Sequence, residues 1–291
     1  MKNILITGAN NQLGNEIREL EPDFSEFILY YTDIDKLDIT NLNSLNDFFN
    51  RHRIDIVINC AAYTAVDKAE SDQIQADFIN HKAVENLRIV TEKHSAYLFH
   101  ISSDYVFDGR KCSPYTEDDP TNPLSAYGLS KLKGEEVIKD YEKALIIRTS
   151  WLFSSFGHNF VKTILRLTDE KNEIKVVFDQ IGSPTYAADL AKTLLTIAKI
   201  INDTPQKFVN GIFNYSNEGV CSWYDFAYHI AKIAKRECKI IPIETKDFPS
   251  PATRPLYSVF NKNKIKNTYN IEISHWLDAL ERCMSLIKIK E

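Results

Sequence analysis

Short apolar runs alternate with amphipathic stretches through the first half of the chain. Apolar runs fill residues 3–7, 27–32 and 54–59, and each is followed by a segment in which apolar residues recur at helical spacing. Runs that are apolar at nearly every position are typical of parallel strands covered by helices on both faces. The alternation therefore predicts an α/β protein built on a Rossmann-type, doubly wound parallel sheet.

The pattern changes in the second half of the chain. A further strand is predicted at residues 174–178, after which the pattern becomes mainly helical. Helices are expected at residues 187–199 and 222–235. We expect a Rossmann domain over residues 1–150 and a second, smaller, mainly helical lobe over residues 151–291. The boundary is not expected to be a clean cut, because a strand near residues 174–185 is expected to return to the main sheet.

The composition is that of an ordinary globular protein, with 44% hydrophobic and 26% charged residues. The net charge of −5 and the lack of a basic cluster give no footprint for nucleic acid, and no apolar run approaches the roughly 18 residues of a membrane helix. The five cysteines never show CxxC spacing, which indicates a reducing compartment and no zinc site. A strand predicted from Asn3 leaves no room for a signal peptide, so we expect a cytoplasmic protein without a structural metal.

A glycine-flanked turn, GANNQLG, lies between the first predicted strand and the first predicted helix. Glycines at such a turn let the backbone approach a pyrophosphate held at the helix N-terminus, although a generic strand-to-helix turn would have the same flanks. Asn11 stands at the middle position, where a β-carbon would crowd a phosphate, but asparagine tolerates a positive φ angle better than other non-glycine residues. The dinucleotide contacts that the turn predicts are Gly8, Asn10, Asn11, Gln12, Leu13 and Gly14.

Two further segments complete the expected cofactor site. Asp33 follows the second predicted strand, where a carboxylate can accept both ribose hydroxyls of NAD and would repel the 2′-phosphate of NADP. This favours NADH over NADPH, unless Asp33 only caps the following turn. Asp38 and Ile39 are expected near an adenine, and Asp38 is equally well explained as a helix cap. Small residues where the third strand stops would let a cofactor lie over the sheet edge, and those expected to contact it are Ala61, Ala62 and Tyr63.

Candidate reaction chemistry lies in the segment that closes with Tyr127 and Lys131. These residues are four apart, so they share one face of a helix and the ammonium can lie beside the phenol. A free phenol titrates near 10, and a nearby positive charge would lower its pKa toward neutral pH. Ser103, at the end of a predicted strand, can donate a hydrogen bond to the same substrate oxygen. The spacing alone is a weak signal, because Tyr228 and Lys232 share it and are expected to form an ordinary surface pair.

A hydroxyl, a phenol and an ammonium that meet at one carbonyl oxygen resemble the Ser/Thr-Tyr-Lys site of the short-chain dehydrogenase/reductase superfamily. The resemblance narrows through six collinear motifs: NCAAYTAVD (59–67), SSDYVF (102–107), RTSW (148–151), NFVKT (159–163), DQIGSPT (179–185) and PATRP (251–255). Six motifs in order are far more specific than any one of them. Together they resemble the dTDP-4-dehydrorhamnose reductases, extended members of that superfamily that reduce the C4 ketone of a dTDP-sugar with NAD(P)H to make dTDP-L-rhamnose for surface polysaccharides.

The resemblance implies a role for each part of the candidate catalytic site. Tyr127 would protonate the C4 oxygen as hydride is delivered, while Lys131 would lower the pKa of the phenol and hydrogen-bond the nicotinamide ribose. Ser103 stands where the family usually has threonine and keeps the donor. Ser102 would contact the cofactor. Asn80 would support the lysine or a water relay, unless it is a polar helix residue that faces solvent.

The resemblance also implies a substrate side, in which the smaller lobe covers a nucleotide-sugar. Asp104 and Phe107 would wall the sugar site, and Trp151 would offer an indole to the apolar face of a deoxysugar, although core packing is the usual fate of such a tryptophan. Arg254, framed by prolines, would bind the diphosphate. The implied substrate contacts are Ser103, Asp104, Phe107, Tyr127, Trp151, Asn159, Gln180 and Arg254.

Two other functions fit the same motifs. One is a different nucleotide-sugar reductase or epimerase of the superfamily. The other is a non-catalytic NAD(P)-binding regulatory subunit that resembles the one of methionine adenosyltransferase. The expected partners are a dTDP-sugar and, through the helices, a second copy in a homodimer. Some relatives hold a metal at a dimer contact, but Glu16 and Asp189 do not complete such a cluster, so no metal is expected.

Overall fold

The computed structural model describes residues 1–287 and is built on a central sheet of six strands, all parallel. The strands are β1 (Lys2–Thr7), β2 (Phe27–Tyr31), β3 (Ile56–Asn59), β4 (Tyr97–Ser103), β5 (Ala144–Thr149) and β10 (Gly211–Tyr215). Their order along the sheet is β10-β5-β4-β3-β1-β2. The order changes direction between β1 and β3, which confirms the doubly wound α/β sheet. In such sheets, ligands bind at the carboxyl ends of the strands at this point.

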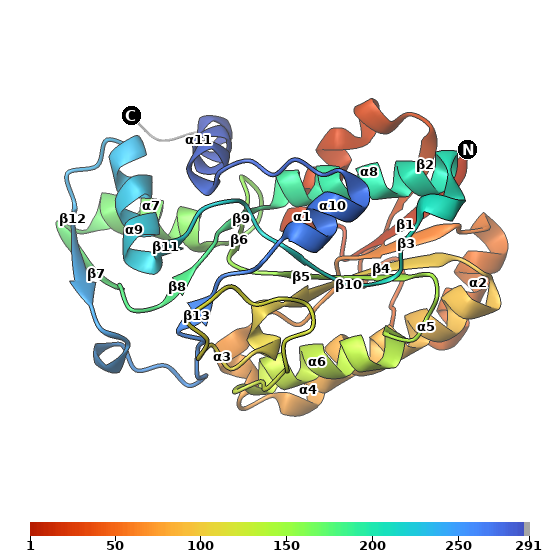
Figure 1. Ribbon diagram of the computed structural model, residues 1–291, viewed down its shortest axis with the longest axis horizontal. Coiled ribbons are helices and arrows are strands. Elements are labelled where there is room, and N and C mark those ends of the chain that lie inside the picture. The colour runs from red at the N-terminus through yellow and green to blue at the C-terminus, as the bar shows by residue number, and fades with distance from the viewer. Residues whose placement is uncertain (288–291) are drawn as a thin grey trace.

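Helices cover both faces of the sheet (Figure 1). Packed on one face are α1 (Gln12–Leu20), α8 (Ala187–Asp203) and α10 (Asn263–Tyr269), and on the other are α2 (Leu42–His52), α5 (Ala83–Lys93) and α6 (Ala126–Ile138). In β1, Ile4 and Ile6 pack into the first layer while Leu5 packs into the second, and all three are fully buried. Because strand side chains alternate between faces, a run that is apolar at every position can bury both.

A second hydrophobic cluster lies beside the sheet and is formed by later parts of the chain. Its helices are α7 (Phe160–Glu170), α9 (Trp223–Ile233) and α11 (Trp276–Leu286). Short strand pairs surround it: β6 (Leu152–Phe153) with β9 (Thr185–Tyr186), β7 (Glu173–Val177) with β12 (Lys239–Ile243), and β8 (Ile181–Gly182) with β11 (Cys221–Ser222) and β13 (Tyr257–Ser258). Figure 1 shows these elements gathered at the end of the molecule opposite β2.

One expectation about the strands is wrong. The strand predicted at residues 174–178 forms β7, but it pairs with β12 in a separate sheet of two strands and does not return to the main sheet. The strand that does return is β10, which pairs with β5, and α8 just before it packs on α1. The chain therefore returns to the first domain later than expected, through residues 187–215.

The segment between β3 and α5 is made of short helices. These are α3 (Val66–Ala69), α4 (Gln73–Asp77) and a π-helical turn, Phe78–Lys82.

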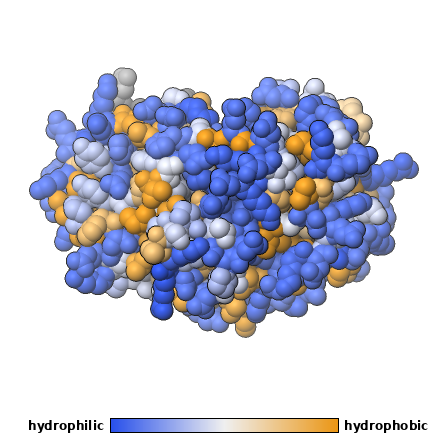
Figure 2. Space-filling view, viewed as in Figure 1, coloured by the Kyte–Doolittle hydropathy of each residue, from blue (hydrophilic) through white to orange (hydrophobic). Residues whose placement is uncertain are grey.

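Within residues 1–287, no helix is both long enough and apolar enough to cross a bilayer. The face shown in Figure 2 is mostly hydrophilic, with apolar side chains in small separate groups.

Candidate active site

Two adjoining cavities follow the carboxyl ends of the central strands. The larger one measures about 500 Å³ and the smaller one about 250 Å³, and both are lined by Asn11 and Ala62. The larger cavity brings together turn residues Asn10, Gln12 and Leu13, strand-end residues Ser102, Ser103, Asp104 and Trp151, and helix residues Tyr127 and Lys131. The smaller cavity is lined by Gly8, Asp33, Asp38, Ile39 and Ala61. Most of the residues expected at the cofactor therefore line one or the other of these two adjoining cavities.

Asn11 organises the turn in a way that its sequence position did not indicate. Its φ angle is −83°, so the positive φ considered for this position is not adopted. The side-chain oxygen Oδ1 accepts a hydrogen bond from the Gly14 N–H at 2.9 Å and caps α1, while Nδ2 donates to the Cys60 carbonyl at 2.6 Å. The positive φ falls on Gly8 instead, at 60°, where a β-carbon would lie 2.6 Å from the backbone of Ala61. Asn11 thus joins the turn after β1 to the end of β3.

Replacing Asn11 by alanine is expected to lower the free energy of unfolding by about 0.5–2 kcal/mol, the usual cost of losing an N-cap side chain. It is also expected to weaken NADH binding, because the turn loses its link to Cys60. Asn41 is the matched control, since it caps α2 in the same way by accepting from the Ser44 N–H at 3.0 Å. Asn41→Ala should lower stability without changing NADH affinity. Denaturant unfolding and NADH titration of both variants test the prediction. If Asn11→Ala bound NADH as tightly as Asn41→Ala, the prediction would be contradicted.

Two carboxylates line the smaller cavity. Asp33 follows β2, and its oxygens accept hydrogen bonds from the backbone N–H groups of Asn10 at 3.1 Å and of Ile34 at 2.9 Å. Asp33 therefore joins the ends of β1 and β2 while it stays partly exposed to the cavity. Asp38 accepts from the backbone N–H and the hydroxyl of Thr40, at 2.9 and 2.7 Å, and so forms a turn just before α2. The N-cap of that helix is Asn41 and not Asp38.

The three candidate catalytic residues come together in the larger cavity. Ser103 ends β4, and Tyr127 and Lys131 lie on α6, whose N-terminus is capped by Ser125 through the Gly128 N–H at 3.1 Å. The Ser103 hydroxyl donates to Asp104 Oδ1 at 2.8 Å and is also hydrogen-bonded to the phenol of Tyr127. The ammonium of Lys131 donates to the Ile101 carbonyl at 2.6 Å. By contrast, Tyr228 is 46% exposed on α9, as expected for a surface residue.

The charge states of these groups are set mainly by burial. Burial raises the pKa of Tyr127 to about 12, Ser103 opposes the shift through its hydrogen bond, and the charge of Asp104 adds to it. The net shift is upward, and the lowering of this pKa by Lys131 stays a prediction. Burial also lowers the pKa of Lys131 to about 8, with the charge of Glu135 acting in the opposite direction. Burial raises the pKa of Asp104 to about 6.

A buried ion pair joins α6 to β5. Arg148 on β5 donates to Glu135 through Nε at 3.0 Å and Nη2 at 2.7 Å, and both side chains are at most 3% exposed. The Ser102 hydroxyl also donates to Glu135. Such a pair is strongly destabilised when one partner is removed, because the other charge is left buried and uncompensated. Glu135 was missed in the sequence, although its place four residues after Lys131 puts it on the same helix face.

Asn80 is buried: only 1% of its surface is exposed, so it does not face solvent. Its amide accepts from the Tyr63 N–H at 2.9 Å and donates to the Tyr63 carbonyl at 3.0 Å. It also donates to Ser130 at 3.0 Å, and Ser130 in turn donates to the Tyr127 carbonyl at 2.7 Å. Asn80 therefore fixes the segment after β3 against α6, and Tyr63 acts here through its backbone.

Only some of the expected substrate residues line the larger cavity. Trp151 lines the larger cavity, but Phe107 does not: it is 1% exposed and stacks on Tyr115, with ring centroids 4.2 Å apart. The expectation that Phe107 walls the sugar site is therefore wrong for this structure, because its ring belongs to a separate hydrophobic cluster. Gln180 is also buried, and its amide donates to the Thr245 hydroxyl at 3.1 Å.

Asn159 and Arg254 hold loops at the edge of the site. Asn159 caps α7 by accepting from the Lys162 N–H at 3.1 Å, and it donates at 3.0 Å to Gln12, which lines the larger cavity. Arg254 Nη2 donates to Asp67 Oδ2 at 2.7 Å, which joins the proline-framed loop to α3. Among residues 1–287, those that line the larger cavity do not include Asn159, Gln180 or Arg254.

Several lining residues of the larger cavity were missed in the sequence. Most of them lie inside or directly beside the motifs named from the sequence, and Gly157 and His158 lie in an irregular segment just before the NFVKT motif. The missed residues are Thr64, Val66, Tyr105, Thr149, Ser150, Leu152, Gly157 and His158.

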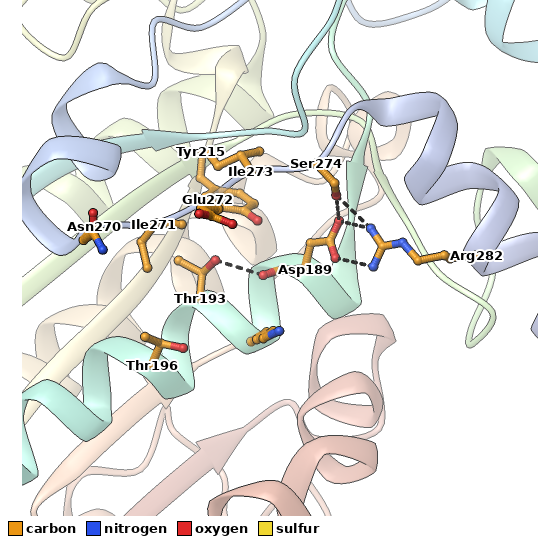
Figure 3. Close-up of a pocket in the computed structure, with 11 residues that line it drawn as sticks. Asp189, Thr193, Thr196, Tyr215, Asn270, Ile271, Glu272, Ile273, Ser274 and Arg282 are labelled. Atoms are coloured by element: carbon orange, nitrogen blue, oxygen red, sulfur yellow. Dashed lines mark hydrogen bonds and ion pairs between the residues drawn. The ribbon is translucent and has the colours of Figure 1, made fainter.

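A third cavity, of about 580 Å³, lies apart from this site, between α8 and residues 270–274 (Figure 3). Asp189 on its wall accepts from both terminal nitrogens of Arg282, at 2.8 and 2.7 Å, and from Ser274 at 2.9 Å.

Glu16, the other carboxylate considered for a metal, accepts from the Ser154 hydroxyl at 2.6 Å. In the described part of the chain, residues 1–287, no group of three or more side chains forms a metal cluster.

Comparison with known proteins places this geometry in a family. The chain matches the family model described as RmlD substrate binding domain over residues 1–289. It is 39% identical over 289 residues to a dTDP-4-dehydrorhamnose reductase of Aggregatibacter actinomycetemcomitans, a match that covers 97% of this chain and 98% of that protein.

Solved structures agree with this match. A dTDP-4-dehydrorhamnose reductase of Clostridium acetobutylicum is 42% identical, with a TM-score of 0.90 and coverage of 98% of this chain and 99% of that one. The reductase of Bacillus anthracis, solved in complex with NADP, is 40% identical, with a TM-score of 0.91 and the same coverage. The family model and both kinds of relatives span essentially the whole chain. The chain therefore belongs to the dTDP-4-dehydrorhamnose reductase family.

Proposed function

We propose that this protein reduces the C4 ketone of dTDP-4-dehydro-L-rhamnose to dTDP-L-rhamnose, with NAD(P)H as hydride donor, in the biosynthesis of cell-surface polysaccharide. The observation that carries the proposal is the convergence of Ser103, Tyr127 and Lys131 in one cavity of about 500 Å³. Family membership supplies the substrate class. The complete set of three side chains argues against a regulatory subunit, which would need only the dinucleotide.

Together the two adjoining cavities suit a nicotinamide dinucleotide. The N-terminus of α1 offers backbone N–H groups and a positive dipole end to a pyrophosphate, and Asp33 offers a carboxylate to a ribose at the far end. The ammonium of Lys131 lies at the opposite end, where it can donate to the second ribose. When bound, the cofactor supplies a hydride to the C4 carbon.

The side chains then complete the reduction. Tyr127, with its pKa raised to about 12, holds its proton at neutral pH and can donate it to the C4 oxygen, whose alkoxide is a much stronger base. Ser103 is hydrogen-bonded to this phenol and so helps to hold the acid in place. Its hydroxyl, which donates to Asp104 here, would donate to the C4 oxygen instead when the sugar is bound. Lys131 keeps a positive charge near the place where negative charge develops.

The substrate side is proposed on fewer contacts. We propose that Trp151 packs against the deoxysugar, that Asp104 lies beside it, and that Arg254 binds the diphosphate after exchanging its bond with Asp67. Residues 151–291 would contribute most of this half of the site. We further propose a homodimer that acts in the cytoplasm, where the five cysteines, all free, would stay reduced.

Initial rates of NADH oxidation test the proposed function. Oxidation should require dTDP-4-dehydro-L-rhamnose, and dTDP-glucose, which has no ketone, should give none. Formation of dTDP-L-rhamnose, identified by mass and by comparison with the authentic compound, should match the NADH consumed. A protein that binds NADH but oxidises none with this sugar would contradict the proposed substrate.

NADH is proposed as the preferred cofactor because Asp33 places a carboxylate at the ribose end of the smaller cavity. Asp33→Asn removes the charge that would repel a 2′-phosphate, so the ratio of kcat/KM for NADPH to that for NADH is expected to rise roughly tenfold, equivalent to about 1.4 kcal/mol. Asp35→Asn is the control, since Asp35 is exposed and its replacement changes the net charge of the protein by the same amount. A wild-type preference for NADPH, or an equal shift in both variants, would contradict this role of Asp33.

A further inference from the structure

Two tryptophans from distant parts of the chain are stacked beside the larger cavity. The rings of Trp151 and Trp223 have centroids 3.7 Å apart and planes inclined by only 12°. Trp151 follows β5 and lines the cavity, whereas Trp223 is the first residue of α9 in the cluster of later helices. The stack therefore connects the wall of the cavity to α9.

The backbone of Trp151 is held in an unusual conformation. Its φ angle is 50°, in the left-handed region that side-chain-bearing residues rarely adopt and that persists only where the surroundings impose it. The Trp151 carbonyl accepts from the Thr185 N–H at 3.2 Å, and the neighbouring Ser150 hydroxyl donates to the Ser183 carbonyl at 2.9 Å. These bonds fix the main chain, but the direction of the indole still depends on what the ring contacts.

Gly182 provides the space for this ring. A β-carbon at Gly182 would lie 2.6 Å from Cε2 and 2.7 Å from Cζ2 of Trp151, closer than real β-carbons approach other atoms. Gly182 belongs to β8, which pairs antiparallel with β11, and the residue after β11 is Trp223. One strand pair therefore brings both Gly182 and Trp223 to the same indole.

Trp223 itself is firmly placed. Ser222 and Asp225 form a capping box at the start of α9: the Ser222 oxygen accepts from the Asp225 N–H at 3.0 Å, and Asp225 accepts from the Ser222 N–H at 2.9 Å. The Trp223 ring also packs on Phe160, with centroids 4.5 Å apart. A residue fixed in this way can fix the ring that stacks on it.

We propose that Trp223 is a positioning residue for the sugar end of the substrate: its indole holds that of Trp151 against Gly182 in one orientation at the cavity wall. Trp223 is not itself among the residues that line the cavity within residues 1–287, so it acts through Trp151. The inference rests on the proposed function, because it assumes that a deoxysugar packs against Trp151. A fixed indole loses no conformational freedom when the sugar binds, which is why the stack would raise affinity.

The test compares Trp223→Leu, which removes the stack, with Trp223→Phe, which keeps an aromatic ring. The KM for dTDP-4-dehydro-L-rhamnose is expected to rise roughly three- to tenfold in Trp223→Leu and less in Trp223→Phe. The KM for NADH is expected to stay unchanged. Trp276→Leu serves as the packing control, since Trp276 is 5% exposed in the same hydrophobic cluster and contacts Phe226 rather than Trp151. It should lower the melting temperature without raising the KM for the sugar.

A double-mutant cycle identifies the route of the effect. If Trp223 acts through Trp151, then Trp223→Leu should raise the sugar KM no further in a Trp151→Leu background. An unchanged sugar KM in Trp223→Leu would overturn the proposal, and so would independent, multiplying effects in the double variant. An equal rise in the NADH KM would also overturn it, because it would indicate general loosening. Wild-type turnover of the sugar is measured first: its absence refutes the proposed function and the inference together, whereas the other outcomes refute the role of Trp223 alone.

Discussion

Replacing Tyr127 by phenylalanine is expected to lower kcat by about 10²- to 10⁴-fold, the contribution typical of a positioned general acid. The substitution removes one hydroxyl and leaves the ring in its buried place, edge-on to Tyr105 with centroids 5.3 Å apart. The effect is expected to fall on kcat because the proton is transferred only as the C4 oxygen gains charge. The binding of NADH, measured by the fluorescence of the bound nicotinamide, is expected to stay close to that of the wild type.

Tyr228→Phe is the matched control for this variant. Tyr228 and Lys232 have the same spacing as Tyr127 and Lys131, but they lie on α9, where Tyr228 is 46% exposed. Turnover in Tyr228→Phe should equal that of the wild type. If Tyr127→Phe turned over at a near-native rate, the proton donor would have to be another group.

Replacing Lys131 by methionine is expected to lower kcat/KM by about 10- to 100-fold. Methionine fills much of the same buried space but cannot make a charge-assisted hydrogen bond, which is worth about 1.5–3 kcal/mol. The loss should appear largely in the KM for NADH, because the ammonium is proposed to hold the nicotinamide ribose. Lys232→Met is the control, and it should leave both kinetic constants unchanged.

The pH dependence of kcat/KM gives a second readout of Lys131. Burial lowers the pKa of its ammonium to about 8, so the charged form prevails below that pH and is lost as the pH rises through it. The wild-type kcat/KM is therefore expected to decline above about pH 8, while Tyr127, with a pKa near 12, stays protonated. Lys131→Arg should shift this decline to higher pH, since a guanidinium keeps its charge. A decline at the same pH in Lys131→Arg would assign it to another group.

The sequence placed the candidate catalytic residues on the correct elements. Ser103 ends a predicted strand, and Tyr127 and Lys131 share a helix face, so local periodicity assigns each residue to its element. That the strand end and the helix face meet was expected only from the resemblance of the motifs. The strands β1, β2 and β3 were predictable for a similar reason, because continuous apolar runs indicate burial on both faces. The turn from Gly8 to Gly14 could be placed at the cofactor end from the same pattern.

Features that depend on contacts between distant residues could not be predicted in this way. β7 pairs with β12, more than 60 residues later, and nothing in either strand specifies that partner. The ring of Phe107 stacks on Tyr115, which turns it away from the cavity. Burial is the main cause of the raised pKa of Tyr127, and the extent of this burial cannot be seen in the spacing of Tyr127 and Lys131. The second bond of Asn11, to the Cys60 carbonyl, likewise joins residues 49 positions apart.

The most direct measurement of the central claim follows deuterium from NADH carrying two deuterium atoms at C4 of the nicotinamide. Incubation with dTDP-4-dehydro-L-rhamnose should give dTDP-L-rhamnose with one deuterium atom at C4 of the sugar, located by NMR, for each NADH oxidised. Tyr127→Phe should form this product far more slowly. Oxidation of NADH without deuterium at C4, or a change in the sugar without consumption of NADH, would contradict direct hydride transfer to the ketone.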